Sequence, residues 1–93
     1  MGENLAEKIA GMSKIIERLK ELERENRNII EKVTSIQFEF ENLNMKGFSD
    51  KMAQLFSSDS KNEELLKEMI KDLEIEINQA KNKLPKAPPP ESK

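Results

Sequence analysis

The sequence predicts an all-α protein, in which one long helix, a short connecting helix and a second helix folded back antiparallel form a hairpin. Charged residues make up 37% of the 93-residue chain and apolar residues 35%, with only 3 glycines, a composition typical of long amphipathic helices. Apolar residues recur at alternating spacings of four and three over two long stretches, and turn-forming residues gather between them. We expect such hairpins to assemble further, as a coiled coil or a multi-helix bundle.

The first helix is predicted from about residue 4 to about residue 44. Its main apolar seam follows the four-three spacing without interruption and contains one polar member, Asn26, among Ile15, Leu19, Leu22, Ile29, Val33, Ile36, Phe40 and Leu43. A stripe of this kind on a single helix predicts that another helix covers it.

An earlier apolar set has the same spacing but is one position out of phase with the main seam. It consists of Leu5, Ile9, Met12, Ile16 and Leu19. The sequence therefore predicts a shift of phase near Ile15 and Ile16, which would change the local supercoil or let the helix contact two neighbours.

Two further helices are expected after Gly47, which is predicted to end the first helix in the left-handed conformation. A short helix at about 49–56 presents Phe48, Met52, Leu55 and Phe56. Ser60 and Glu63 form a capping-box pattern that predicts the start of helix two, at about 61–83. The seam of helix two includes Leu66, Ile70, Leu73 and Ile77.

The hairpin is expected to form one domain over residues 1–84. Pro85 ends helix two, and residues 85–93, with three consecutive prolines, are predicted to be a disordered tail. The Ser57–Ser60 linker also fits an acidic-directed phosphorylation site, and capping alone explains the same pattern.

The composition argues against catalysis and cofactor binding. Cysteine and histidine are absent, which excludes thiolate chemistry and zinc sites built from these residues. No nucleophile with a general base and no glycine-rich phosphate loop can be named. We therefore expect no enzyme activity, no cofactor and no metal ion.

The charge pattern argues against nucleic acid and membrane partners. The 16 basic and 18 acidic residues are mixed along the chain, so no basic patch is available for nucleic acid. No apolar run is long enough to span a bilayer, and an intracellular location is expected by default. A peripheral membrane protein that lays an amphipathic helix on lipid remains an alternative, which the mixed polar face disfavours.

The width of the apolar face favours a bundle over a two-stranded coil. Ile16 and Ile30 fall on flanking positions that a dimeric zipper fills with charge. Asn26 either pairs with a polar partner in the core and fixes register, or lies at a hydrated gap in the seam. Because the predicted helix two is the shorter one, the stripe from Leu5 to Leu22 is expected to stay bare and to bind another chain.

We therefore expect a non-catalytic interaction protein, either a small subunit of an intracellular complex or a homo-oligomeric scaffold. Whether the helices of different chains run parallel or antiparallel is left open. The predicted interface consists of Leu5, Ile9, Met12, Ile15, Ile16, Leu19, Leu22, Asn26, Ile29, Ile30, Val33, Ile36, Phe40, Leu43, Leu66, Ile70, Leu73 and Ile77.

Overall fold

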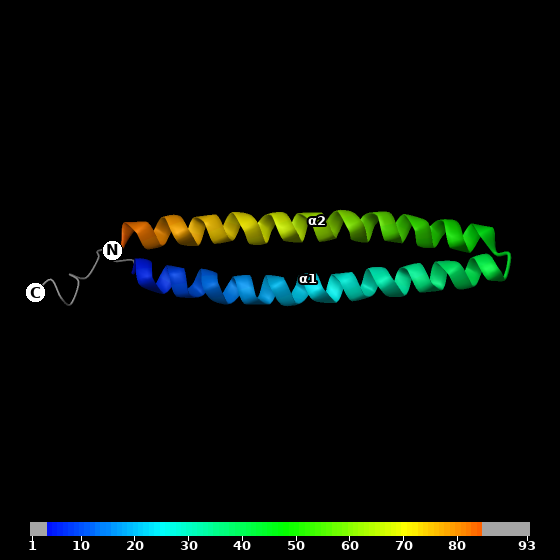
Figure 1. The fold of residues 1–93 in the computed structure, drawn as a ribbon, viewed down its shortest axis with the longest axis horizontal. Helices are drawn as coiled ribbons and strands as arrows, with labels where there is room; N and C mark the ends of the chain where they lie inside the picture. The colour runs from blue at the N-terminus through cyan, green and yellow to red at the C-terminus, as the bar shows by residue number, and fades with distance from the viewer. Residues whose placement is uncertain (1–3, 85–93) are drawn as a thin grey trace, which may run out of the picture.

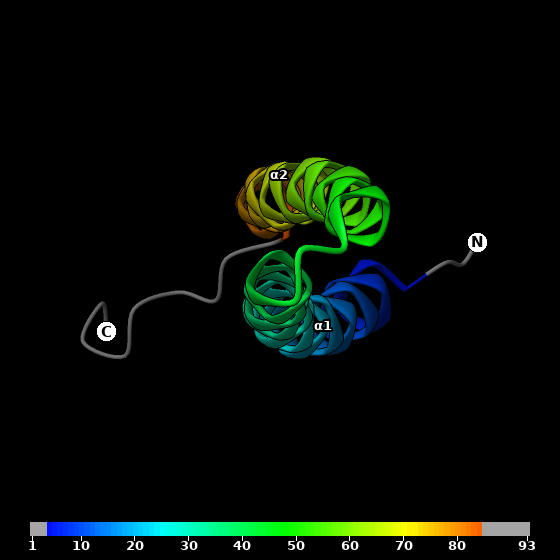
Figure 2. The ribbon, with the colours of Figure 1, turned by 90° about the vertical axis from the view of Figure 1, so that its right-hand side faces the viewer.

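The protein is a hairpin of two long antiparallel helices packed side by side (Figure 1). The computed structural model describes residues 4–84, and the predicted tail lies outside these residues. Helix α1 is Leu5–Asn42 and helix α2 is Lys46–Lys83, each of 38 residues. At 1.5 Å per residue each helix is about 57 Å long. Viewed along the long axis, the two helices are inclined to one another (Figure 2).

Helix α1 begins at a side-chain cap. The Oδ1 atom of Asn4 accepts hydrogen bonds from the backbone N–H groups of Ala6 and Glu7, at 3.0 and 3.4 Å. These bonds satisfy two of the four N–H groups that lack a partner in the first turn. The Asn4 side chain therefore defines where helix α1 begins.

A tight turn joins the helices, and Asn44 is its left-handed residue, with φ of 58°. The N–H of Met45 donates to the carbonyl of Phe40 and that of Asn44 donates to the carbonyl of Glu41, at 2.9 and 3.0 Å, which is the Schellman arrangement. The prediction that Gly47 would end the helix in this conformation is wrong, because no described glycine has positive φ and Gly47 lies in the first turn of α2. Asn is the non-glycine residue best suited to the conformation.

The all-α antiparallel hairpin is confirmed, but the short connecting helix is not a separate element. The segment expected at 49–56, the predicted linker Ser57–Ser60 and helix two form one continuous helix, α2. Ser60 therefore lies inside this helix and does not cap it. Serine and aspartate disfavour a helix interior by only about 0.5 kcal/mol each, which packing along α1 readily offsets.

The core is a single seam between the two helices. Ile9, Ile16 and Ile77 are buried in one cluster, with five partly buried side chains packed against it: Leu5, Met12, Leu73, Ala80 and Leu84. Val33 and Leu66 are buried further along the seam. The prediction that the stripe from Leu5 to Leu22 is bare is wrong for its buried members, because α2 begins at Lys46 and is as long as α1.

Candidate interaction surface

The apolar residues of α1 divide into two rows. The row that faces α2, here called the inner seam, keeps the four-three spacing of the early set along the whole helix: Leu5, Ile9, Met12, Ile16, Leu19, Glu23, Asn26, Ile30, Val33, Gln37 and Phe40 are all buried or half-buried. The expected shift of phase near Ile15 is therefore absent. The set predicted to start at Leu5 and the set predicted to start at Ile15 are two neighbouring faces of one regular helix.

The second row of α1, here called the outer stripe, repeats at every seventh residue and is not covered by α2. It consists of Ile15, Leu22, Ile29, Ile36 and Leu43, whose side chains are between 42% and 67% exposed. Each member except Leu43 immediately precedes an inner-seam residue in the sequence, so the stripe borders the seam along its length. Of the nine residues of the predicted main seam, four thus lie inside the hairpin and five lie on its surface.

Helix α2 has a matching stripe of its own. On α2 the inner seam contains Met52, Leu66, Ile70, Leu73 and Ile77, and the residues at every seventh position beside it are Phe48, Leu55, Asn62 and Met69. Phe48, Leu55 and Met69 are between 41% and 53% exposed. Phe48 also contacts Phe40 across the turn, with ring centroids 5.1 Å apart.

The two outer stripes lie on the same side of the hairpin. In an antiparallel pair, the residues that follow the second seam position of each heptad meet on one side, and those that precede the first seam position meet on the other. Lys20 follows Leu19 and Glu74 follows Leu73, and their charged groups are 3.7 Å apart on the first side. The residues that precede the seam, which form the outer stripes, therefore meet on the opposite side.

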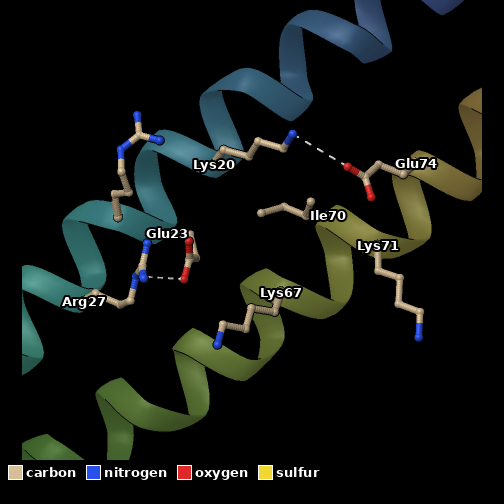
Figure 3. Close-up of a pocket in the computed structure, with 8 residues that line it drawn as sticks. Lys20, Glu23, Arg27, Lys67, Ile70, Lys71 and Glu74 are labelled. Carbon is tan, nitrogen blue, oxygen red and sulfur yellow. Dashed lines mark ion pairs between the residues drawn. The ribbon is translucent and has the colours of Figure 1, made fainter.

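The side marked by Lys20 and Glu74 is polar (Figure 3). It holds a surface cavity of about 400 Å³ lined by Lys20, Glu23, Arg24, Arg27, Lys67, Ile70, Lys71 and Glu74. Charged side chains of this kind remain hydrated at little cost. The hairpin therefore has one charged side and one apolar side.

A polar contact interrupts the inner seam near its middle. The amide nitrogen of Asn26 donates hydrogen bonds to the backbone carbonyl of Asp59 at 3.0 Å and to Oε1 of Glu63 at 3.2 Å. Glu63 is only 9% exposed. Arg27 and Lys67 each lie 3.8 Å from its Oε2 atom, which accepts no hydrogen bond within the described residues. Asn26 is thus paired across the helices, which is one of the two alternatives that its core position left open.

Glu63 and Glu23 form a carboxyl pair on the charged side of this contact. A hydrogen bond to Glu63 raises the pKa of Glu23, with burial and the Glu63 charge adding to the effect. Burial also raises the pKa of Glu63, but hydrogen bonds from Glu23 and Asn26, with Lys67 and Arg27 nearby, outweigh burial and leave that pKa below its usual value. The Arg27 guanidinium, with its Nε 3.1 Å from Oε2 of Glu23, partly offsets the rise in the pKa of Glu23, and the titrations of the two carboxyl groups depend on each other.

This carboxyl pair was not predicted from the sequence. Both glutamates occupy inner-seam positions, but Glu63 was interpreted as a helix-capping residue and Glu23 was given no role in the core. The available signal was the four-three spacing itself, because extending the Leu5 register through residue 23 and the Leu66 register back to residue 63 places both residues in the seam.

Several other features complete the surface. Phe38 and Ile75 lie outside the inner seam and the outer stripes, and both are exposed. Within residues 4–84, no group of three acidic side chains is placed to hold a metal ion, and neither helix is long and apolar enough to cross a bilayer. No protein-family model, curated protein or solved structure matches the chain. Its function must therefore be inferred from the chemistry of these surfaces.

Proposed function

We propose that the protein is a non-catalytic structural protein that assembles with other helices through the apolar side of its hairpin. The observation that supports this proposal is the pair of outer stripes, which follow the seven-residue repeat of helix packing and meet on one side. The intracellular location expected from the sequence remains part of the proposal.

The size of the apolar side supports a binding role. Eight apolar side chains contribute to it: Ile15, Leu22, Ile29, Ile36, Leu43, Phe48, Leu55 and Met69. With about 200 Å² for a fully exposed side chain of this size, half-exposed residues present roughly 100 Å² each, or about 800 Å² in total. The largest apolar patch on a typical monomer is about 300–600 Å². A patch above that range indicates a binding surface.

The shape of this side also fits a helix. A surface hollow lies between Ile15, Leu19 and Leu22 on α1, bordered by charged residues, and another lies beside Leu55 on α2. Hollows between side chains one turn apart are where the side chains of a neighbouring helix insert. The occupant that we propose is therefore a helix, which would convert the two-helix layer into a bundle.

Replacing Leu22 and Ile36 together by lysine tests the proposal. Both residues are half-exposed, so the hairpin should keep its helix content by circular dichroism, while two charges are placed in the proposed interface. The control is the double variant Phe38→Lys with Ile75→Lys, which changes two exposed apolar residues outside the stripes.

Sedimentation velocity and circular dichroism of the full chain give the answer. An oligomer that the stripe variant dissociates and the control leaves intact supports the proposal. A poorly helical or aggregated chain, which the stripe variant makes monodisperse, also supports it and indicates that the natural partner is a different chain. A wild-type chain that is helical, unfolds reversibly and stays monomeric up to millimolar concentration contradicts it.

A further inference from the structure

We infer that the apolar side of the hairpin binds a second copy of this chain, with the two copies antiparallel and related by a two-fold axis near Asn28. This inference rests on the proposed function and adds the identity and direction of the partner. Viewed along its axis, the hairpin is a single layer of two helices (Figure 2), so stacking two such layers on their apolar sides gives a four-helix bundle.

A row of charged side chains borders the outer stripe of α1. This charged row consists of Arg18, Glu25, Lys32 and Glu39, which are spaced seven residues apart, alternate in sign and are all exposed. Residues in this position beside an interface face their counterparts on the adjacent helix. The signs of the charges in this row therefore indicate which partner helix, and in which direction, has the charges complementary to those of α1.

An antiparallel copy of α1 matches this row completely. With the axis near Asn28, Arg18 lies level with Glu39 of the second copy and Glu25 lies level with Lys32 of the second copy. Because the axis is two-fold, each pairing occurs twice, and every charge of the row meets one of opposite sign. The same register places Leu22 within one residue of the level of Ile36 of the second copy, so the exposed apolar stripes of the two copies face each other.

Helix α2 also supports the antiparallel dimer, because its register relative to α1 is fixed within the hairpin. Asn26 is level with Glu63 inside the hairpin, so the same axis passes α2 near Lys61. It then places Lys51 within two residues of the level of Asp72 of the second copy, again with opposite signs, and the exposed Leu55 within one helical turn of the exposed Met69 of the second copy. One axis therefore satisfies both helices, although their sequences are unrelated.

The outer stripe of α2 has a polar member, Asn62, which is exposed and lies within about two residues of the inferred axis. In the dimer the Asn62 side chains of the two copies lie in one central layer, where their amide groups can pair. A single polar layer at the centre fixes the register of a bundle.

The buried area agrees with a stable dimer. Covering about 800 Å² of apolar surface on each copy removes roughly 1,600 Å² from water, which is the standard size of a specific interface. The main alternative is a two-fold axis that runs parallel to the helices and brings α1 of one copy against α2 of the other. It places Glu25 beside Leu65 and Lys32 beside Ser58 of the second copy, so two of the four charges lose their partners.

A charge swap tests the inference on the full chain. Glu25→Lys alone and Lys32→Glu alone each create two like-charge pairs across the axis, and each should weaken dimerisation about tenfold. The double variant restores opposite charges and should return the dissociation constant to within about threefold of wild type. Within one hairpin the two residues are seven positions apart, so a restored dimer reports contact between copies.

The matched control is Glu17→Lys with Arg24→Glu, a second pair of opposite charges seven residues apart that lies off the apolar side. This control should leave the dissociation constant, measured by sedimentation equilibrium, unchanged. A dimer in which the double variant is no tighter than the single variants overturns the antiparallel arrangement. A chain that stays monomeric alone overturns self-association, while the stripe test above decides separately whether the proposed function fails with it.

Discussion

The amide nitrogen of Asn26 donates a hydrogen bond of 3.2 Å to the carboxylate of Glu63, linking the middles of the two helices. The contact sits in an otherwise largely apolar seam, where a polar pair costs stability but permits only one alignment of the helices. It therefore fixes the register of the hairpin and, through the hairpin, the level at which the outer stripes face one another.

Removing one partner of this contact should destabilise the hairpin. Asn26→Ala leaves the buried Glu63 carboxylate without its amide donor and should lower the free energy of unfolding by about 1–2 kcal/mol. Urea denaturation followed by circular dichroism measures the change. The exposed Asn28→Ala is the control and should stay within about 0.5 kcal/mol of wild type.

Replacing both partners should have the opposite sign. Asn26→Leu with Glu63→Leu turns a desolvated polar pair into an apolar layer and should raise the free energy of unfolding by about 1 kcal/mol or more. The same variant should associate less specifically, so that sedimentation detects more than one associated species. A double variant that is less stable than Asn26→Ala would contradict the role given to this layer.

The carboxyl pair predicts opposite pH effects for its two members. The pKa of Glu63 is lowered by folding, so its contribution is present above the ordinary value and is lost as the pH falls through the lowered pKa. The pKa of Glu23 is raised by folding, so its contribution is present at low pH and is lost as the pH rises through the raised pKa. Ionisation of Glu23 therefore destabilises the hairpin at neutral pH.

Glutamine variants separate the two effects. Glu23→Gln keeps a donor for Glu63 without the charge, and should raise stability at pH 7 by up to about 1 kcal/mol. Glu63→Gln removes the titrating carboxyl group. It should therefore abolish the part of the fall in unfolding free energy at acidic pH that Glu63 causes. Urea denaturation between pH 3 and pH 8 compares them, with the outward-facing Glu21→Gln as the control for losing a charge. Equal profiles for the three variants would contradict opposite pH effects of Glu23 and Glu63.

Truncation should distinguish the inner seam from the outer stripe. Ile16 and Ile77 are each 6% exposed, so Ile16→Ala or Ile77→Ala should cost about 2–4 kcal/mol. Leu22 and Ile29 are half-exposed, so their alanine variants should cost less than about 1 kcal/mol in the monomer and should instead weaken association. Unfolding must be measured at concentrations where sedimentation shows monomer. Equal losses at both rows would contradict this division.

Two backbone positions should respond in opposite directions to alanine. Gly11 lies inside α1 with no atom within 4 Å of an added Cβ, so Gly11→Ala should raise stability by about 0.5–1 kcal/mol. Asn44 has φ of 58°, so Asn44→Ala should lower stability by about 1 kcal/mol, whereas Asn44→Gly should not. Thermal unfolding of the three variants checks both helix continuity and the turn.

The apolar spacing was sufficient to predict the antiparallel hairpin. It also placed Asn26 and Val33 correctly in the seam. It did not predict which of two offset rows packs inside, because Ile15 and Ile16 are equally apolar and either row fits the four-three rule. That choice depends on the apolar row that α2 presents over its full length, a tertiary property that local spacing does not contain.

The continuity of α2 was missed for a related reason. Ser57, Ser58 and Ser60 disfavour a helix individually, and local propensity therefore predicted a break. The seam continues through Phe56 and Asp59 to Glu63, and packing along α1 outweighs those small preferences. Glu63 was then misread as a capping residue, which concealed the carboxyl pair.

Distances between spin labels on two copies distinguish the antiparallel dimer from every other arrangement of the two hairpins. The chain has no cysteine, so Asn28→Cys and Lys14→Cys each provide one labelling site on the outward row of α1. An antiparallel dimer with its axis near Asn28 predicts a short distance between labels at position 28. It predicts a separation of roughly 40 Å along the axis between labels at position 14. Double electron–electron resonance that finds similar distances at the two positions would contradict the antiparallel dimer.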